Sequence, residues 1–164
     1  MSNSQVVSAD LIIAQLDVMN YQEIVQALGD KLQAFGYVKD SYVAAVIKRE
    51  GIFPTGLPLG DINVAIPHTD VEHVNKPAIA VATLAHPVAF GNMGDPGETL
   101  EVSIVFLLAM KEPHAQVDLL QNLVETFQNP KILESLLATN DELEIESILK
   151  QYLEPKEALY GTRN

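Results

Sequence analysis

Hydrophobic positions along the chain repeat with two different periods, which predicts a fold built from both helices and strands. Helical spacings or helix-start signals cover residues 20–36, 40–51, 113–127, 131–137 and 140–153. Short apolar runs that are typical of strands cover residues 11–17, 62–68, 78–85 and 101–109, and the last two are apolar almost throughout. We therefore predict the α/β class, as a single domain with a central mixed β-sheet flanked by helices on both faces.

Capping residues indicate where these helices begin. Asn20, with Glu23 three residues later, resembles a capping box, and Asp40 is the expected cap of the second helix. Pro113 is expected to open the third helix. Asn129-Pro130 combines a cap with a proline at the first helical position of the fourth.

The remaining segments complete the expected organisation. Between the two long apolar runs, residues 87–90 are a candidate short edge strand, and residues 91–99 are expected to form a loop because glycine and proline are frequent there. Residues 1–164 contain no repeat, low-complexity tract or linker. We expect one domain with a core over about residues 8–153 and a polar C-terminal tail.

Composition and charge narrow the function classes. Hydrophobic residues make up 48% of the 164 residues, and the formal net charge is −12. This charge opposes binding to nucleic acid or to an anionic membrane surface and suits a partner with a basic patch. Because the chain has no cysteine, disulfides and thiolate chemistry are excluded. We see no signal-peptide pattern and no apolar run long enough for a bilayer, so we expect a cytoplasmic protein without direct membrane insertion.

His68 is the first candidate for chemistry, because it directly follows an apolar run that ends in Ile66-Pro67. Open α/β sheets tend to place their sites where strands end. Pro67 restricts the backbone and holds Ile66 in extended geometry, so the imidazole is expected at a fixed angle. Thr69 and Asp70 are expected to orient or tune the ring. A loop histidine held by ordinary hydrogen bonds is the alternative, and local composition leaves both interpretations open.

His114 and Arg49 are the second and third candidates. His114 is in the first turn of a predicted helix, where free backbone N–H groups also suit an anion. If the strands before His68 and His114 are parallel neighbours, the two rings face one crevice; otherwise His114 is a partly exposed first-turn residue. Arg49 is a rare cation in an acidic chain, and compensation of the helix dipole is its alternative role.

The other two histidines are weaker candidates. His73 is five residues from His68, which is not the spacing of a helical metal pair, and His86 precedes a proline in a probable turn. We expect both to be structural or surface residues, and we expect no metal site and no cofactor. A small hydrolase or metal enzyme that uses His68, His73 and Asp70 is a less favoured alternative.

These residues fit phosphoryl transfer. The sequence has no P-loop, dinucleotide fingerprint or nucleophile elbow. A neutral imidazole is a nucleophile toward phosphorus, and the charge on a transferring phosphoryl group is stabilised by a guanidinium, a second imidazole or amides at a helix start. No nucleotide site is needed if the donor is another phosphoprotein.

Two segments together resemble a known family. Arg49-Glu50, Pro54-Thr55-Gly56 and Pro67-His68 stand in the order and spacing seen in enzyme IIA domains of the fructose–mannitol class, from the phosphoenolpyruvate-dependent sugar phosphotransferase system. The segment "VFLLAMKEPHAQVDLLQNL" is similar to the second family segment, with a strand, a turn, a histidine and a leucine-rich helix. The resemblance spans roughly residues 8–153. One departure is Ile62-Asn63-Val64, where many relatives have glycine, so the shape of the turn there is open.

The resemblance implies a role for each candidate. His68 would accept phosphate from the carrier protein HPr and pass it to a cysteine of enzyme IIB, which serves the membrane enzyme IIC. His114 would be the second active-site histidine, and Arg49 would stabilise the phosphate. Details around residues 86–102 look most like the galactitol-type branch. The alternative within the family is a regulatory protein of the nitrogen-related branch, which acts by binding targets.

Overall fold

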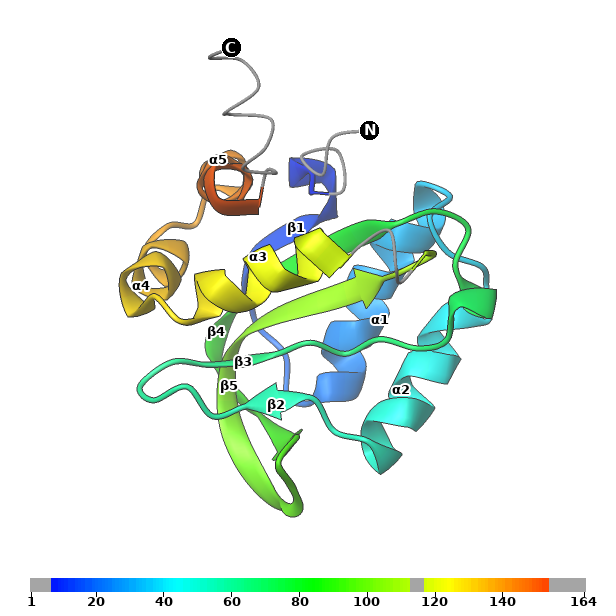
Figure 1. Ribbon diagram of the computed structural model, residues 1–164, viewed down its shortest axis with the longest axis horizontal. Helices are drawn as coiled ribbons and strands as arrows, with labels where there is room; N and C mark the ends of the chain where they lie inside the picture. Colours follow the sequence, from blue (N-terminus) through cyan, green and yellow to red (C-terminus); the bar gives the residue numbers. More distant parts are fainter. Residues whose placement is uncertain (1–6, 113–116, 154–164) are drawn as a thin grey trace.

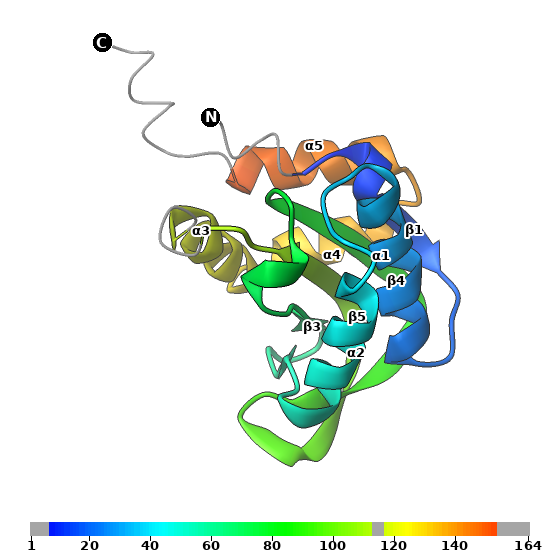
Figure 2. The same ribbon diagram turned by 90° about the vertical axis from the view of Figure 1, so that its right-hand side faces the viewer.

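The computed structural model describes residues 7–112 and 117–153, which form a mixed β-sheet with helices on both faces (Figure 1 and Figure 2). This confirms the predicted α/β class. The strands lie in the order β1-β4-β2-β3-β5, and β4 also pairs with β5. The strands are β1 (Ile12–Leu16), β2 (Gly56–Leu57), β3 (Asn63–Ala65), β4 (Ala78–Asn92) and β5 (Asp95–Ala109). The helices are α1 (Tyr21–Ala34), α2 (Tyr42–Ile52), α3 (Val117–Phe127), α4 (Pro130–Ala138) and α5 (Glu142–Leu153), with short 3-10 turns at Ala9–Leu11 and Val71–His73.

Two hydrophobic cores sandwich the sheet. Helices α1 and α2 pack on one face, and α3, α4 and α5 pack on the other (Figure 2). On β5, Val105 and Leu107 belong to the first core, while Ile104 and Phe106 belong to the second. Because successive side chains of a strand point to opposite faces, a strand that is buried on both faces must be apolar throughout. Among the described residues, no helix is long and apolar enough to cross a membrane.

The hairpin of β4 and β5 is longer than the sequence predicts. Residues 87–90 continue β4 rather than forming a separate edge strand, and most of the expected loop at residues 91–99 is strand. A tight turn follows Asn92, whose side chain accepts a hydrogen bond from Gly94 N–H (2.8 Å) and donates one to Glu98 (3.1 Å). The loop prediction was wrong because residues 95–99 are exposed and polar, yet their backbones still pair with β4.

The helix caps agree with the sequence at all but one tested position. Asn20 accepts a hydrogen bond from Glu23 N–H, and Asn129 accepts one from Lys131 N–H. The predicted cap at Asp40 was wrong by one residue: Ser41 is the N-cap, and its side chain makes no capping hydrogen bond. The expected start of the third helix at Pro113 lies outside the described residues.

Candidate functional site

The hairpin of β2 and β3 places His68 at the end of a strand. Gly56 pairs with Ala65 in antiparallel register, so the Pro54-Thr55-Gly56 segment lies beside the segment that leads to His68. On its other side β3 runs parallel to β5, and the ladder extends to Pro67, whose carbonyl accepts a hydrogen bond from Leu108 N–H at 3.0 Å. The backbone is therefore held from both sides immediately before His68.

Close backbone packing accounts for the glycine of the Pro-Thr-Gly segment. A Cβ atom at Gly56 would lie 2.5 Å from the carbonyl oxygen of Gly91 on β4, and a Cβ at Gly91 would lie 2.6 Å from the ring of Pro54. Neither backbone can yield without breaking the pairing between β2 and β4. The two glycines thus allow residues 54–56 to pack tightly on β4.

The turn between β2 and β3 is closed by Asn63, at the point where the sequence departs from the family pattern. Its side chain accepts a hydrogen bond from Leu59 N–H (2.9 Å) and donates one to the carbonyl of Glu101 (3.0 Å). Gly60, with φ of 126°, supplies the conformation that other residues rarely adopt. The departure at residues 62–64 therefore still leaves a well-connected turn.

The His68 ring is half-buried and bound on one side. Its Nδ1 lies 2.9 Å from the carbonyl oxygen of Ile66. A carbonyl only accepts hydrogen bonds, so in the neutral ring Nδ1 carries the proton and Nε2 has the free lone pair. The orientation expected from Thr69 or Asp70 thus comes from the backbone of Ile66.

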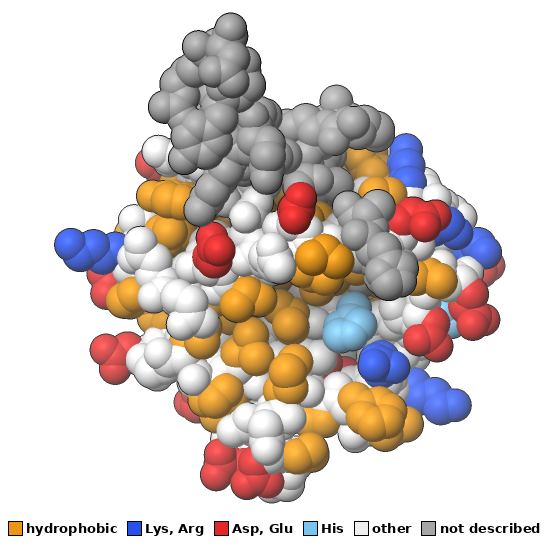
Figure 3. Space-filling model, in the orientation of Figure 1, with side chains coloured by type: hydrophobic (Ala, Val, Ile, Leu, Met, Phe, Trp, Pro, Cys, Tyr) orange, Lys and Arg blue, Asp and Glu red, His pale blue; other side chains and the backbone are white. Residues whose placement is uncertain are grey.

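Arg49 lies in the last turn of α2, beside the segment that contains His68. Its Nη1 is 4.0 Å from Asp70, and the guanidinium stacks 5.2 Å from the ring of Phe53. Arg49 Nε is buried and has no hydrogen-bond partner within residues 7–112 and 117–153. The side chain as a whole is 37% exposed, so its outer guanidinium N–H groups can reach an incoming anion. Figure 3 shows a basic side chain next to a histidine on this face of the molecule.

His114 itself lies outside the described residues, and the structure bears only on the strands that precede the two candidate histidines. The strands β3 and β5, which precede His68 and His114, are parallel neighbours, as the prediction required. His73 is bonded to Ser41 (2.8 Å) and His86 to Asp17 (3.0 Å), so both have ordinary surface partners. Among the described residues, no group of three or more His, Cys, Asp and Glu side chains is arranged to hold a metal ion.

No role for Glu50 was predicted from the sequence, although this residue is one of the most unusual near the site. Glu50 is only 5% exposed, and its carboxylate accepts hydrogen bonds from the backbone N–H (2.8 Å) and the hydroxyl (2.9 Å) of Thr55. Burial raises the pKa of Glu50 from 4.5 to about 7, against the lowering effects of Thr55 and of Arg49. The adjacent Arg-Glu pair was a visible signal, but burial of the carboxylate follows only from the packing of α2.

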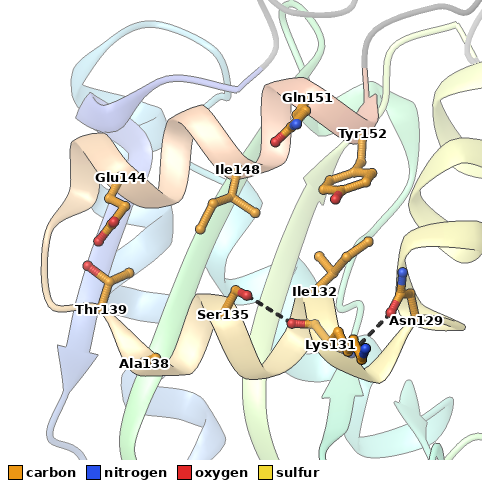
Figure 4. Close-up of a pocket in the computed structure, with 10 residues that line it drawn as sticks. All are labelled: Asn129, Lys131, Ile132, Ser135, Ala138, Thr139, Glu144, Ile148, Gln151 and Tyr152. Atoms are coloured by element: carbon orange, nitrogen blue, oxygen red, sulfur yellow. Dashed lines mark hydrogen bonds between the residues drawn. The ribbon is translucent and has the colours of Figure 1, made fainter.

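A pocket of about 550 Å³ lies elsewhere, between α4 and α5 (Figure 4). It is lined mainly by polar side chains such as Asn129, Ser135 and Glu144, and its lining includes no residue from the end of β3. This pocket is therefore separate from the segment that contains His68.

The raised pKa of Glu50 predicts a specific pH dependence of stability. Between about pH 4.5 and 7 the folded protein holds a proton at Glu50 that the unfolded chain releases, so unfolding free energy should fall as pH rises. The Glu50→Gln variant has no titratable group at position 50, so its stability lacks this pH dependence. The unfolding free energy of wild type relative to that of the variant should therefore fall by roughly 2–3 kcal/mol as pH rises through this range.

The measurement is urea unfolding at several pH values, with Glu146→Gln as a matched control. Glu146 also accepts a backbone N–H, from Ala9, but its side chain is 22% exposed and lies 3.7 Å from Lys150. A difference that stays constant with pH for Glu50→Gln would show that the carboxyl titrates normally.

Known proteins match this chain over most of its length. The model of the family described as "Phosphoenolpyruvate-dependent sugar phosphotransferase system, EIIA 2" matches residues 5–152. The galactitol-specific EIIA component of Escherichia coli K12 is 30% identical over 138 residues, which cover 84% of this chain and 91% of that protein.

Solved structures agree. Enzyme IIAMTL in its complex with phosphorylated enzyme IIBMTL from Escherichia coli is 25% identical, with a TM-score of 0.69 over 87% of this chain and 95% of that chain. The mannitol-specific cryptic enzyme IIA CmtB of Escherichia coli shares the fold, at 21% identity and a TM-score of 0.74 over 90% of this chain and 97% of that chain. Together with the family match, these likenesses show that the chain belongs to the EIIA 2 family of the phosphoenolpyruvate-dependent sugar phosphotransferase system and is a phosphotransferase that carries phosphate on histidine.

Proposed function

We propose that His68 is the phosphate acceptor of a cytoplasmic carrier, which takes phosphate from phospho-HPr and passes it to a cysteine of enzyme IIB. The observation that carries the proposal is the hydrogen bond between Nδ1 and the Ile66 carbonyl, because it leaves Nε2 as the free nucleophile. The 30% identity to a galactitol-specific component supports galactitol as the sugar taken up by the complete system.

The first transfer needs one bond to form and one to break. The Nε2 lone pair of His68 attacks the phosphorus of the phosphohistidine on HPr. The N–P bond of the donor breaks, and its electron pair returns to the donor imidazole. Nδ1 keeps its proton, so the phosphorylated ring is cationic, and the Ile66 carbonyl stabilises this form by accepting the Nδ1–H.

The second transfer reverses the role of His68. A thiolate of enzyme IIB attacks the phosphorus, the N–P bond breaks, and Nε2 regains its lone pair in a neutral imidazole. A neutral imidazole is a good leaving group. The hydrogen bond from Nδ1–H to the Ile66 carbonyl therefore supports both the acceptance of phosphate and its release. The solved complex of enzyme IIAMTL with phosphorylated enzyme IIBMTL supports an enzyme IIB partner for this chain.

Arg49 and His114 are proposed to stabilise the transferring phosphoryl group. The Arg49 side chain is 37% exposed, so its outer guanidinium N–H groups are donors available to a phosphoryl oxygen. His114 follows β5, the parallel neighbour of β3, and so would add an imidazole from the adjacent strand end. Both groups act in the same way, by placing a donor where negative charge spreads in the transition state.

Exposed apolar side chains near Arg49 and His68 suit docking of protein partners. Ile52 and Phe53 are 57% and 59% exposed, and Val71 is 39% exposed. Figure 3 shows several hydrophobic side chains on the face that carries the histidine. Apolar side chains at a partly polar surface are typical of interfaces. The net charge of −12 favours a partner with a basic surface, which is what the family resemblance implies for HPr.

Phosphorylation by enzyme I, HPr and phosphoenolpyruvate tests the acceptor. Wild type should gain one acid-labile phosphate, and His68→Ala should gain none. His114→Ala should still be labelled, more slowly, while the surface variant His86→Ala should be labelled at the wild-type rate. Label on a histidine of His68→Ala would contradict the assignment. Onward transfer to an enzyme IIB cysteine distinguishes a transport carrier from a regulatory protein, which would keep its phosphate.

Replacement of Arg49 tests its donor role. Arg49→Lys keeps the charge but loses the planar fork and Nε, so transfer should slow by about tenfold, and Arg49→Ala should slow it by about a hundredfold. The neighbouring Lys48 is exposed, and Lys48→Ala is the matched control for loss of a nearby cation. The measurement is the rate of transfer from phospho-HPr in rapid-mixing experiments. Wild-type rates in Arg49→Lys would mean that only the charge matters.

A further inference from the structure

Four residues form a continuous hydrogen-bonded chain from the protein interior to the ring of His68. The Glu50 carboxylate accepts from the N–H and hydroxyl of Thr55, at 2.8 and 2.9 Å. Thr55 in turn accepts the N–H of Ile66, at 3.2 Å on its hydroxyl oxygen and 3.3 Å on its carbonyl. The carbonyl of Ile66 then accepts from His68 Nδ1 at 2.9 Å. Each link is a direct contact.

The chain fixes the direction of the Ile66 carbonyl. Thr55 holds the N–H of Ile66, and the following Pro67 keeps Ile66 in extended geometry. The carbonyl of Pro67 is itself bound by Leu108 N–H at 3.0 Å. With the backbone held on both sides of this carbonyl, the oxygen has one direction in which to point, and the imidazole of His68 lies there.

Glu50 and Thr55 cannot reach a partner protein or a phosphoryl group directly. They are 5% and 3% exposed, so any effect on the reaction passes through the backbone that they hold. Burial of a carboxylate is costly unless strong hydrogen bonds satisfy it. Here the backbone N–H and the hydroxyl of Thr55 donate those hydrogen bonds. Because the hydroxyl proton points to Glu50, the lone pairs of its oxygen face Ile66 N–H.

We propose that Glu50 and Thr55 are positioning residues, which hold Ile66 so that its carbonyl selects the Nδ1–H tautomer of His68 and leaves Nε2 bare. This inference rests on the proposed function of His68 as phosphate acceptor, but it also makes a claim about the unphosphorylated ring. A residue with a merely structural role would change stability and leave the tautomer unchanged. The tautomer is therefore the decisive observable.

Thr55→Val tests the proposal, because it keeps the shape of the side chain and removes the hydroxyl from the middle of the chain. Thr55→Ser restores the hydroxyl. Thr126→Val is the matched control, since Thr126 is equally buried at 3% and its hydroxyl donates to the carbonyl of Asn122 within α3, which packs on the other face of the sheet from α2. Glu50→Gln is a milder variant, because its amide can still accept from Thr55 N–H while the hydroxyl loses its carboxylate acceptor.

Two measurements are made on each folded variant. Nitrogen NMR shifts of the His68 ring at alkaline pH report the tautomer, and rapid mixing with phospho-HPr reports the rate of transfer. Wild type, Thr55→Ser and Thr126→Val should show a protonated Nδ1 and a bare Nε2. In Thr55→Val the two nitrogen shifts should move toward each other as both tautomers become populated, and the rate should fall by about tenfold. Glu50→Gln should change the nitrogen shifts and the transfer rate in the same direction as Thr55→Val.

Every outcome of these measurements either supports or overturns the proposal. A His68 tautomer and a transfer rate that are both unchanged in Thr55→Val would overturn the proposal, as would a change of the same size in Thr126→Val. A changed rate with an unchanged tautomer would also overturn it. Failure of wild type to be phosphorylated at His68 would refute the proposed function instead, and the NMR result would still test the positioning of the ring.

Discussion

The hydrogen bond from His68 Nδ1 to the carbonyl of Ile66 is the constraint on which the chemistry of this site depends. A free imidazole exchanges its proton between two nitrogens and offers either of them to an electrophile. In this protein the carbonyl, 2.9 Å from Nδ1, holds the proton on one side. In the proposed mechanism it thereby decides which nitrogen faces the partner, and it stabilises the cationic ring that a phosphoryl group on the other nitrogen would create.

Much of the surrounding fold serves to keep that carbonyl in place. The hairpin of β2 and β3 brings Thr55 next to Ile66, and two glycines allow it to pack closely on β4. Leu108 connects the site to the helix layer. Its N–H donates a hydrogen bond to the carbonyl of Pro67, and its carbonyl accepts one from the buried hydroxyl of Tyr42 in α2 at 2.7 Å. The last turn of the same helix contains Arg49 and Glu50. Consecutive residues on α2 thus present a guanidinium to the proposed phosphate site and a carboxylate to the interior.

The sequence predicted what depends on local chemistry and on strand patterning. The long apolar runs of β4 and β5 reveal burial on both faces, and Pro67 before His68 reveals a rigid approach at the end of a strand. Residues 91–99 were predicted as a loop because the exposed end of the hairpin carries no apolar pattern, and only pairing with a distant strand makes it regular. The burial of Glu50 was equally hidden, because the Arg-Glu pair is visible in the sequence but the packing of α2 against Thr55 is not.

The central claim is that His68 reacts through Nε2 because Ile66 occupies Nδ1. The most direct test is nitrogen and phosphorus NMR of the protein after phosphorylation by phospho-HPr, which identifies the nitrogen that carries phosphorus. We predict a scalar coupling between phosphorus and Nε2 of His68, with a proton retained on Nδ1. Phosphorus on Nδ1, or on a different histidine, would contradict the account.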